Sequence, residues 1–178
     1  MSRLILRGAR FPGDIAIEDG KIAGLGTIEA LSGDTVLDCQ GDIVTAGLVN
    51  THHHLYQWMT RGEATGCNLF DWLVHLYPVW NELTVEDVYI AALVGLGELA
   101  ATGCTTASDH HYLVPGGDDR VFDAIVEASK QVGIRLFLSR GSMDLGESKG
   151  GLPPDRVVED RDSILSSTKA IAERHHDG

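Results

Sequence analysis

Apolar and polar positions in the first 45 residues follow a pattern typical of short β-strands. Five short runs are continuously apolar or alternate between apolar and polar residues: 4–6, 14–18, 21–25, 35–38 and 42–44. Asp19 and Gly20 separate the second run from the third and form a two-residue hairpin signal. The pattern predicts a small β module whose isolated charged residues lie on its solvent-exposed face.

From residue 47 the hydrophobic period changes, and short apolar strands alternate with amphipathic helices. Buried strands are predicted over 47–49, 104–109 and 134–138, and helices over 84–102, 121–132 and 155–175. Residues 55–81 show no clear period, and we expect an irregular segment whose aromatic side chains pack together. The order of strand and helix is typical of successive right-handed βα units on a parallel sheet, so the fold class is α/β.

Ionisable side chains follow each of the three predicted strands. They are the histidines at 52–54, the Asp-His-His run at 109–111, and Arg140. In (β/α) barrels and in open α/β folds alike, functional sites lie at the carboxyl ends of parallel strands. We therefore expect these residues to gather at one edge of the sheet.

His52 and His54 are the candidate metal ligands. Successive side chains of an extended chain point to opposite sides, so these two share one side and His53 takes the other. Two imidazoles on one side make a compact pair of nitrogen ligands for a divalent metal. The alternatives from residue chemistry alone are a hydrogen-bonded structural cluster and a solvated run. Gln57 and Arg61 follow closely, and such amide and guanidinium donors between aromatic walls suit a planar heterocycle.

Composition narrows the range of partners and compartments. The chain of 178 residues has 14 basic and 26 acidic side chains and a net charge of −12, which argues against nucleic acid and anionic membranes. Three widely spaced cysteines predict neither a disulfide framework nor a cysteine zinc site, so a cytoplasmic location is expected. Neither a signal peptide nor a membrane span is predicted.

The segments 47–54, 83–84 and 103–109 together resemble the amidohydrolase superfamily, within its cytosine deaminase and triazine hydrolase branch. A finer resemblance, to 8-oxoguanine deaminases, rests on four stretches: 52–57, 108–112, 140–146 and 150–154. The resemblance implies part of a small β-sandwich domain over residues 1–46 and the first three βα units of a (β/α)8 TIM barrel over 47–178. Such a barrel takes about 250 residues. We therefore expect the chain to be an N-terminal fragment of a longer, homo-oligomeric enzyme.

The resemblance also implies one catalytic divalent metal, zinc or iron, with His52 and His54 as two of its ligands. A histidine from the fifth strand, an aspartate from the eighth, and the general acid and base that transfer protons are expected beyond Gly178. Gln57, Arg61 and Arg140 are the expected substrate contacts, and His110 is a weaker candidate.

The implied activity is hydrolytic deamination of a purine-like heterocycle, 8-oxoguanine giving urate and ammonia. Alternative small-molecule substrates are guanine, isoxanthopterin and a chlorotriazine. A different class of function, a non-catalytic half-barrel, stays open for these 178 residues taken alone.

Overall fold

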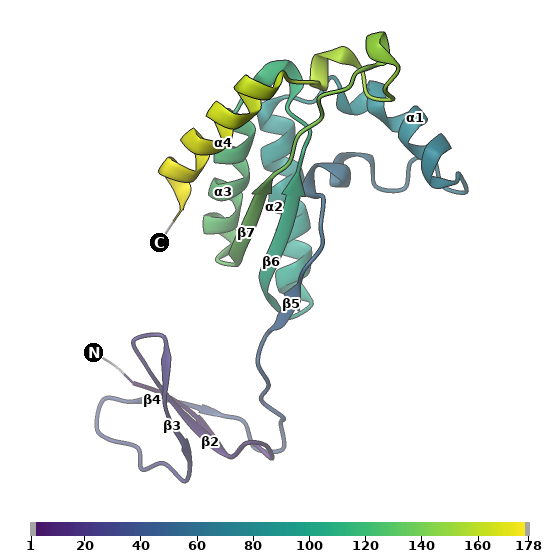
Figure 1. Ribbon diagram of the computed structural model, residues 1–178. Coiled ribbons are helices and arrows are strands. Elements are labelled where there is room, and N and C mark those ends of the chain that lie inside the picture. Colours follow the sequence, from purple (N-terminus) through teal and green to yellow (C-terminus); the bar gives the residue numbers. More distant parts are fainter. Residues whose placement is uncertain (1–2, 177–178) are drawn as a thin grey trace. The chain divides into compact units, whose positions relative to one another are not determined.

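The structure is a computed structural model that describes residues 3–176, and it forms two compact units, 1–46 and 47–178 (Figure 1). The first unit is a four-stranded sheet in the order β3-β2-β1-β4. Its strands are β1 (Leu4–Arg7), β2 (Asp14–Glu18), β3 (Lys21–Gly26) and β4 (Thr35–Asp38). β1 pairs antiparallel with β2 and parallel with β4, and β2 pairs antiparallel with β3.

The hairpin between β2 and β3 turns at Asp19 and Gly20, both with positive φ, as the Asp-Gly pair predicts. The strand predicted at 42–44 is wrong. Ile43 makes only an isolated parallel bridge with Phe11, held by the Arg10 N–H on the Asp42 carbonyl and the Val44 N–H on the Phe11 carbonyl, and the pairing extends no further.

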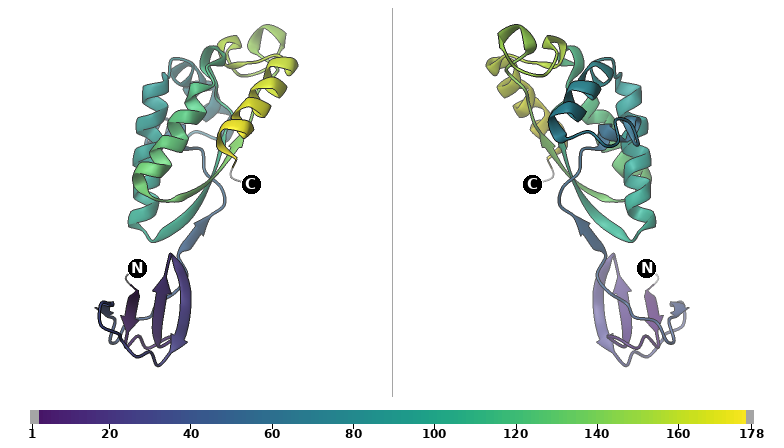
Figure 2. Two further views of the ribbon diagram at one scale, coloured as in Figure 1. Left: turned by 90° about the vertical axis from the view of Figure 1, so that its left-hand side faces the viewer. Right: turned by 90° about the vertical axis from the view of Figure 1, so that its right-hand side faces the viewer.

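The second unit contains a parallel three-stranded sheet in the order β5-β6-β7. Its strands are β5 (Leu48–Asn50), β6 (Cys104–His111) and β7 (Arg135–Arg140), and its longer helices are α1 (Leu69–Trp80), α2 (Val85–Ala101), α3 (Arg120–Val132) and α4 (Arg161–His175). α2 packs on β6, α3 packs on β7, and the two helices lie side by side on one face of the sheet (Figures 1 and 2). The α/β class predicted from the sequence is confirmed.

Local signals set the ends of these helices. Thr84 caps α2 through a capping box: its hydroxyl accepts the Asp87 N–H, and the Asp87 carboxylate accepts the Thr84 N–H. Gly133 ends α3 in the left-handed conformation at φ 78°, which a glycine adopts without steric cost.

The main core lies between the sheet and the helices. Fully buried members from α2, α3 and the segment after β5 include Leu55, Val88, Ala92, Leu96, Phe122 and Ile125. A second cluster forms around α1 with Tyr56, Leu76 and Trp80. None of the helices within residues 3–176 has the length and apolar character needed to cross a membrane.

Three predictions for this unit are wrong. Residues 55–81 are irregular only over 61–68, which join the 3₁₀ segment η1 (Leu55–Thr60) to α1. The period of α1 is hidden because apolar side chains occur on its exposed side and Pro78 lies in its last turn. α4 begins at Arg161 rather than at 155, since the Asp160 carboxylate caps that point. β5 is not buried: Leu48 and Val49 are each 62% exposed on a strand that has one neighbour.

The end of the chain bears on one further expectation. The general acid and base and the remaining metal ligands are expected beyond Gly178, and Gly178 itself lies outside the described residues. That expectation therefore stays a prediction.

Candidate functional site

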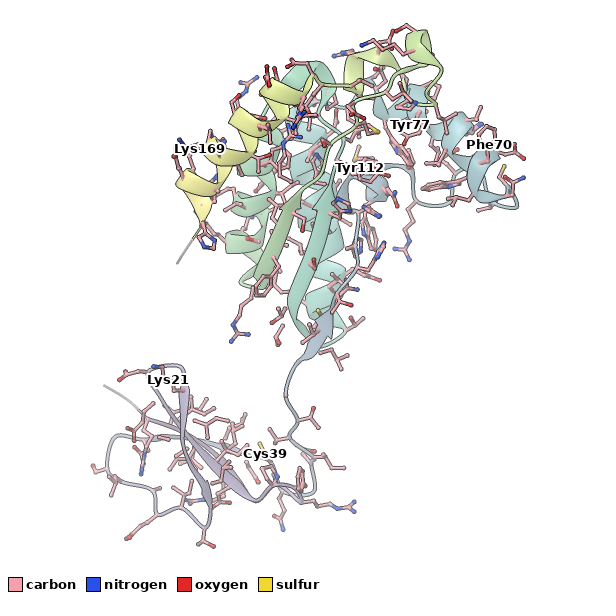
Figure 3. All side chains as sticks on the ribbon, in the orientation of Figure 1. Lys21, Cys39, Phe70, Tyr77, Tyr112 and Lys169 are labelled. Atoms are coloured by element: carbon pink, nitrogen blue, oxygen red, sulfur yellow. The ribbon has the colours of Figure 1, made fainter. Side chains whose placement is uncertain are left out.

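The three histidines follow β5 rather than extending it, because the strand ends at Asn50. The Asn50 side chain accepts the His52 N–H at 3.2 Å, and the His53 carbonyl accepts the His110 N–H at 2.9 Å. The histidine segment is therefore held against the carboxyl end of β6. Tyr112, labelled at this end of the sheet in Figure 3, places its ring centroid 5.3 Å from that of His54.

His52 and His54 converge. Their Nε2 atoms lie 3.2 Å apart, and their rings are perpendicular. His54 Nδ1 lies 2.7 Å from the His110 carbonyl oxygen, which can only accept, so Nδ1 carries the proton and Nε2 presents a lone pair. Two nitrogens that each bind one tetrahedral zinc at about 2.0–2.1 Å lie a little over 3 Å apart, so this pair fits two positions of such a site.

The protonation state of His54 also suits a ligand. Burial, the largest cause, lowers the pKa of the His54 imidazole, and the nearby His52 and His110 lower it further against the opposing bond to the His110 carbonyl. The neutral imidazole is the form that binds metals. Among residues 3–176, no third histidine, cysteine or carboxylate completes a group of metal ligands.

The His53 ring contacts Trp58 rather than another histidine. Its Nε2 accepts the Trp58 indole N–H at 3.3 Å, and the two rings are stacked. Burial lowers the pKa of His53, which keeps this imidazole neutral as an acceptor. Trp58 therefore gives His53 a structural role within the segment.

A recess of about 270 Å³ opens beside His54 and is formed largely by η1. Gln57 and Arg61 both line it, together with the rings of Trp58 and Trp72. The Arg61 guanidinium lies 4.6 Å above the centre of the Trp58 ring, a cation–π contact at an exposed site. The structure thus brings two of the predicted substrate contacts next to a predicted metal ligand.

Arg140 lies apart from that recess. Its side chain is only 4% exposed and forms an ion pair with Glu159. The remaining N–H groups of the guanidinium donate to the Ser167 hydroxyl and the Gly141 carbonyl. The N–H groups of Arg140 are therefore used in contacts within the fold, with the chain just after β7, with Glu159 before α4 and with Ser167 in α4.

His110 contributes through its backbone. Its N–H and carbonyl hold His53 and His54 respectively, while its exposed ring lies near Gly141 and Tyr112. The predicted contact of this imidazole with substrate stays a prediction.

Asp109 and His111 belong to the run expected at the functional edge of the sheet, but the sequence assigned neither of them a specific role. Both are fully buried on the helix-covered side of β6, opposite the ring of His110. Asp109 Oδ1 accepts the Leu55 N–H at 2.8 Å, and burial raises the pKa of this carboxyl to about 7 against that bond. Burial lowers the pKa of His111 to about 3, and its ring packs edge-on against Tyr56 and Phe122. The alternation of side chains along a strand, applied to residues 109–111, was the sequence signal that could have placed Asp109 and His111 on one face.

Comparison with known proteins gives a consistent picture. The chain is 44% identical over 169 residues to 8-oxoguanine deaminase of Pseudomonas aeruginosa, covering 92% of this chain and 38% of that protein. It is 34% identical over 183 residues to hydroxydechloroatrazine ethylaminohydrolase of Pseudomonas sp. strain ADP, covering 92% and 37%. The chain thus spans about two-fifths of the length of these relatives.

The solved structures agree. An atrazine chlorohydrolase of Arthrobacter aurescens, determined in complex with zinc, superposes with a TM-score of 0.88 at 28% identity, covering 98% of this chain and 43% of that one. A model of the amidohydrolase family matches residues 43–178, which include the converging histidines and the recess beside them. The chain belongs to the amidohydrolase family.

Proposed function

We propose that this chain supplies the first two metal ligands and part of the substrate recess of a hydrolytic deaminase that acts on a purine-like heterocycle, with 8-oxoguanine as the preferred substrate. The observation that carries the proposal is the convergence of His52 and His54 at 3.2 Å beside a recess lined by Gln57 and Arg61. The 44% identity to an 8-oxoguanine deaminase supports the choice of substrate.

The proposal extends to the fold of the whole protein. The β5–β7 sheet with its helices corresponds to the first three βα units of a (β/α)8 TIM barrel, and the β1–β4 sheet to part of a small β-sandwich. Support comes from the match to about two-fifths of a solved triazine hydrolase chain. In such barrels the chemistry lies at the carboxyl ends of the strands, where the histidine pair of this chain lies.

Zinc is the proposed metal, since it suits imidazole ligands and is present in the related atrazine chlorohydrolase. When bound, zinc lowers the pKa of water to about 7 and so makes hydroxide available at neutral pH. The reaction replaces the exocyclic amine of a ring carbon by oxygen and releases ammonia. With 8-oxoguanine the product is urate.

The residues of this chain orient both the ligands and the heterocycle. The His110 carbonyl fixes the His54 tautomer, so that the Nε2 lone pair faces His52. The Gln57 amide can donate and accept in one plane, which matches a ring N–H beside a ring carbonyl. Arg61 offers donors to a carbonyl oxygen and is held in place by the Trp58 ring.

A second candidate substrate is a triazine, favoured by the 34% identity to an ethylaminohydrolase of that ring class. The different class of function is a half-barrel without catalysis. A specific observation favours it for these residues alone: within 3–176 no third ligand joins the pair. Catalytic zinc sites use three protein ligands.

Steady-state kinetics of a protein of the relatives' length that contains this chain test the proposal. Ammonia release is measured with 8-oxoguanine, guanine, isoxanthopterin and a hydroxylated aminotriazine. We expect the highest kcat/KM with 8-oxoguanine. A higher value with the triazine or the pterin would replace the substrate, and absence of turnover with all four in a zinc-loaded protein would refute deamination.

A further inference from the structure

The backbone pairing of β5 with β6 ends before the histidine segment, residues 52–54, begins. Its last register pair is Asn50 with Ala107. Beyond that pair, three hydrogen bonds hold residues 53–55 to residues 109–110. Two of them use the backbone of His110, and the third uses the side chain of Asp109.

The third bond is the one that joins the histidine segment to η1. Leu55 is the first residue of η1, and no side chain of the preceding residue His54 caps that start. The first N–H groups of a helix have no partner inside the helix. Leu55 is fully buried, so water is not available to its N–H, and the Asp109 carboxylate accepts it at 2.8 Å.

Asp109 contacts Leu55 from the face of β6 that is opposite the His110 ring. Alternation along β6 places Asp109 on the helix-covered face and the His110 ring on the open face. The carboxylate therefore reaches the chain immediately after His54 from the core. The His110 carbonyl reaches the His54 ring from the other direction.

We propose that Asp109 is a positioning residue: it caps the Leu55 N–H and thereby fixes His54 so that its Nε2 stays opposite His52 Nε2. The inference rests on the proposed role of the two histidines as metal ligands. Residues that orient metal ligands typically change metal affinity by about 10- to 100-fold when they are replaced. Asp109 differs from such residues in acting through the backbone of Leu55, which adjoins His54 and lies 54 positions from Asp109 in sequence.

Zinc titration of the 178-residue chain, followed by NMR of the histidine ring nitrogens and by hydrogen exchange of the Leu55 amide, tests the inference. For Asp109→Ala we expect zinc affinity to fall about 10- to 100-fold and the Leu55 amide to lose protection. Asp109→Asn keeps an acceptor oxygen, so it should restore both. Ile125→Val is the matched control, because it removes one methyl group from the same core cluster and leaves the acceptor of the Leu55 N–H in place.

Two further variants distinguish an error in the proposed ligand pair from an error in the proposed role of Asp109. If His54→Ala leaves zinc binding unchanged, the proposed ligand pair itself is wrong. If His54→Ala removes zinc binding while Asp109→Ala binds as the wild type does, the positioning role of Asp109 is overturned. Asp109→Leu, similar in size but without an acceptor, serves where the alanine variant does not fold.

Should neither apolar variant fold, Asp109→Asn decides. Wild-type zinc affinity with a protected Leu55 amide supports the role, and wild-type affinity with an unprotected amide overturns it.

Discussion

Gly95 and Gly97 lie two positions apart in α2 and form a matched pair for substitution by alanine. A Cβ at Gly95 would lie 2.7 Å from Cδ1 and Nε1 of Trp58 and 2.8 Å from a methyl carbon of Leu55. A Cβ at Gly97 would have no heavy atom within 4 Å. The first substitution forces α2 and η1 apart, and the second does not.

The magnitudes follow from two terms. Alanine is favoured over glycine in a helix interior by about 0.8–1 kcal/mol, and both variants gain it. Overpacking a close contact costs about 1–3 kcal/mol, and only Gly95→Ala incurs it. Gly97→Ala should therefore raise the free energy of unfolding by about 1 kcal/mol, and Gly95→Ala should lie about 1–3 kcal/mol below it.

Urea denaturation followed by tryptophan fluorescence measures this difference. All three tryptophans, Trp58, Trp72 and Trp80, belong to the second unit, so the signal reports the unit that contains α2. Since η1 directly follows His54, Gly95→Ala should also weaken zinc binding, whereas Gly97→Ala should leave it unchanged. Equal stability of the two variants would refute the packing of η1 against α2 described above.

Three other predictions concern charge and capping. Glu159→Ala leaves the buried Arg140 guanidinium with only the longer 4.0 Å contact to the Asp119 carboxylate and should cost up to about 3–5 kcal/mol of stability, while replacing Arg140 by Met and Glu159 by Leu should restore most of the loss; thermal denaturation of the single and double variants measures this. Thr84→Ala removes the α2 cap and should cost about 1 kcal/mol in the same measurement, whereas Thr84→Ser should cost little. Asp109 keeps its proton up to a pKa of about 7 in the folded chain but releases it near pH 4 when unfolded, so its contribution to stability should fall by about 3 kcal/mol as the pH rises from 4 to 7. Asp109→Asn should remove that fall, and a difference between variant and wild type that does not change with pH would contradict it.

Signals confined to neighbouring residues were predictable from the sequence. The capping box at Thr84, the glycine that ends α3 and the Asp19-Gly20 hairpin each specify a local conformation, and the structure shows all three. These three features need no knowledge of what packs against them. Chain alternation also predicts that His52 and His54 share one side, whereas their approach to 3.2 Å additionally uses the distant His110 carbonyl.

Features that depend on distant contacts were not predictable in the same way. The bond between Asp109 and Leu55 spans 54 positions, and its two partners carry no shared motif. Arg140 follows a strand, as a substrate contact would, yet Glu159 and Ser167 take its donors inside the fold. The period of α1 was hidden by its exposed apolar side chains, among them Phe70 at 63% exposure.

The central claim is that His52 and His54, and not His53, hold the metal of an amidohydrolase. Zinc content, measured by elemental analysis in a purified protein of the relatives' length that contains this chain, tests it most directly with two neighbouring variants. We expect His54→Ala to lose bound zinc and His53→Ala to retain it, because the two imidazoles point in different directions. Equal loss of zinc from both variants, or full retention in His54→Ala, would contradict the account.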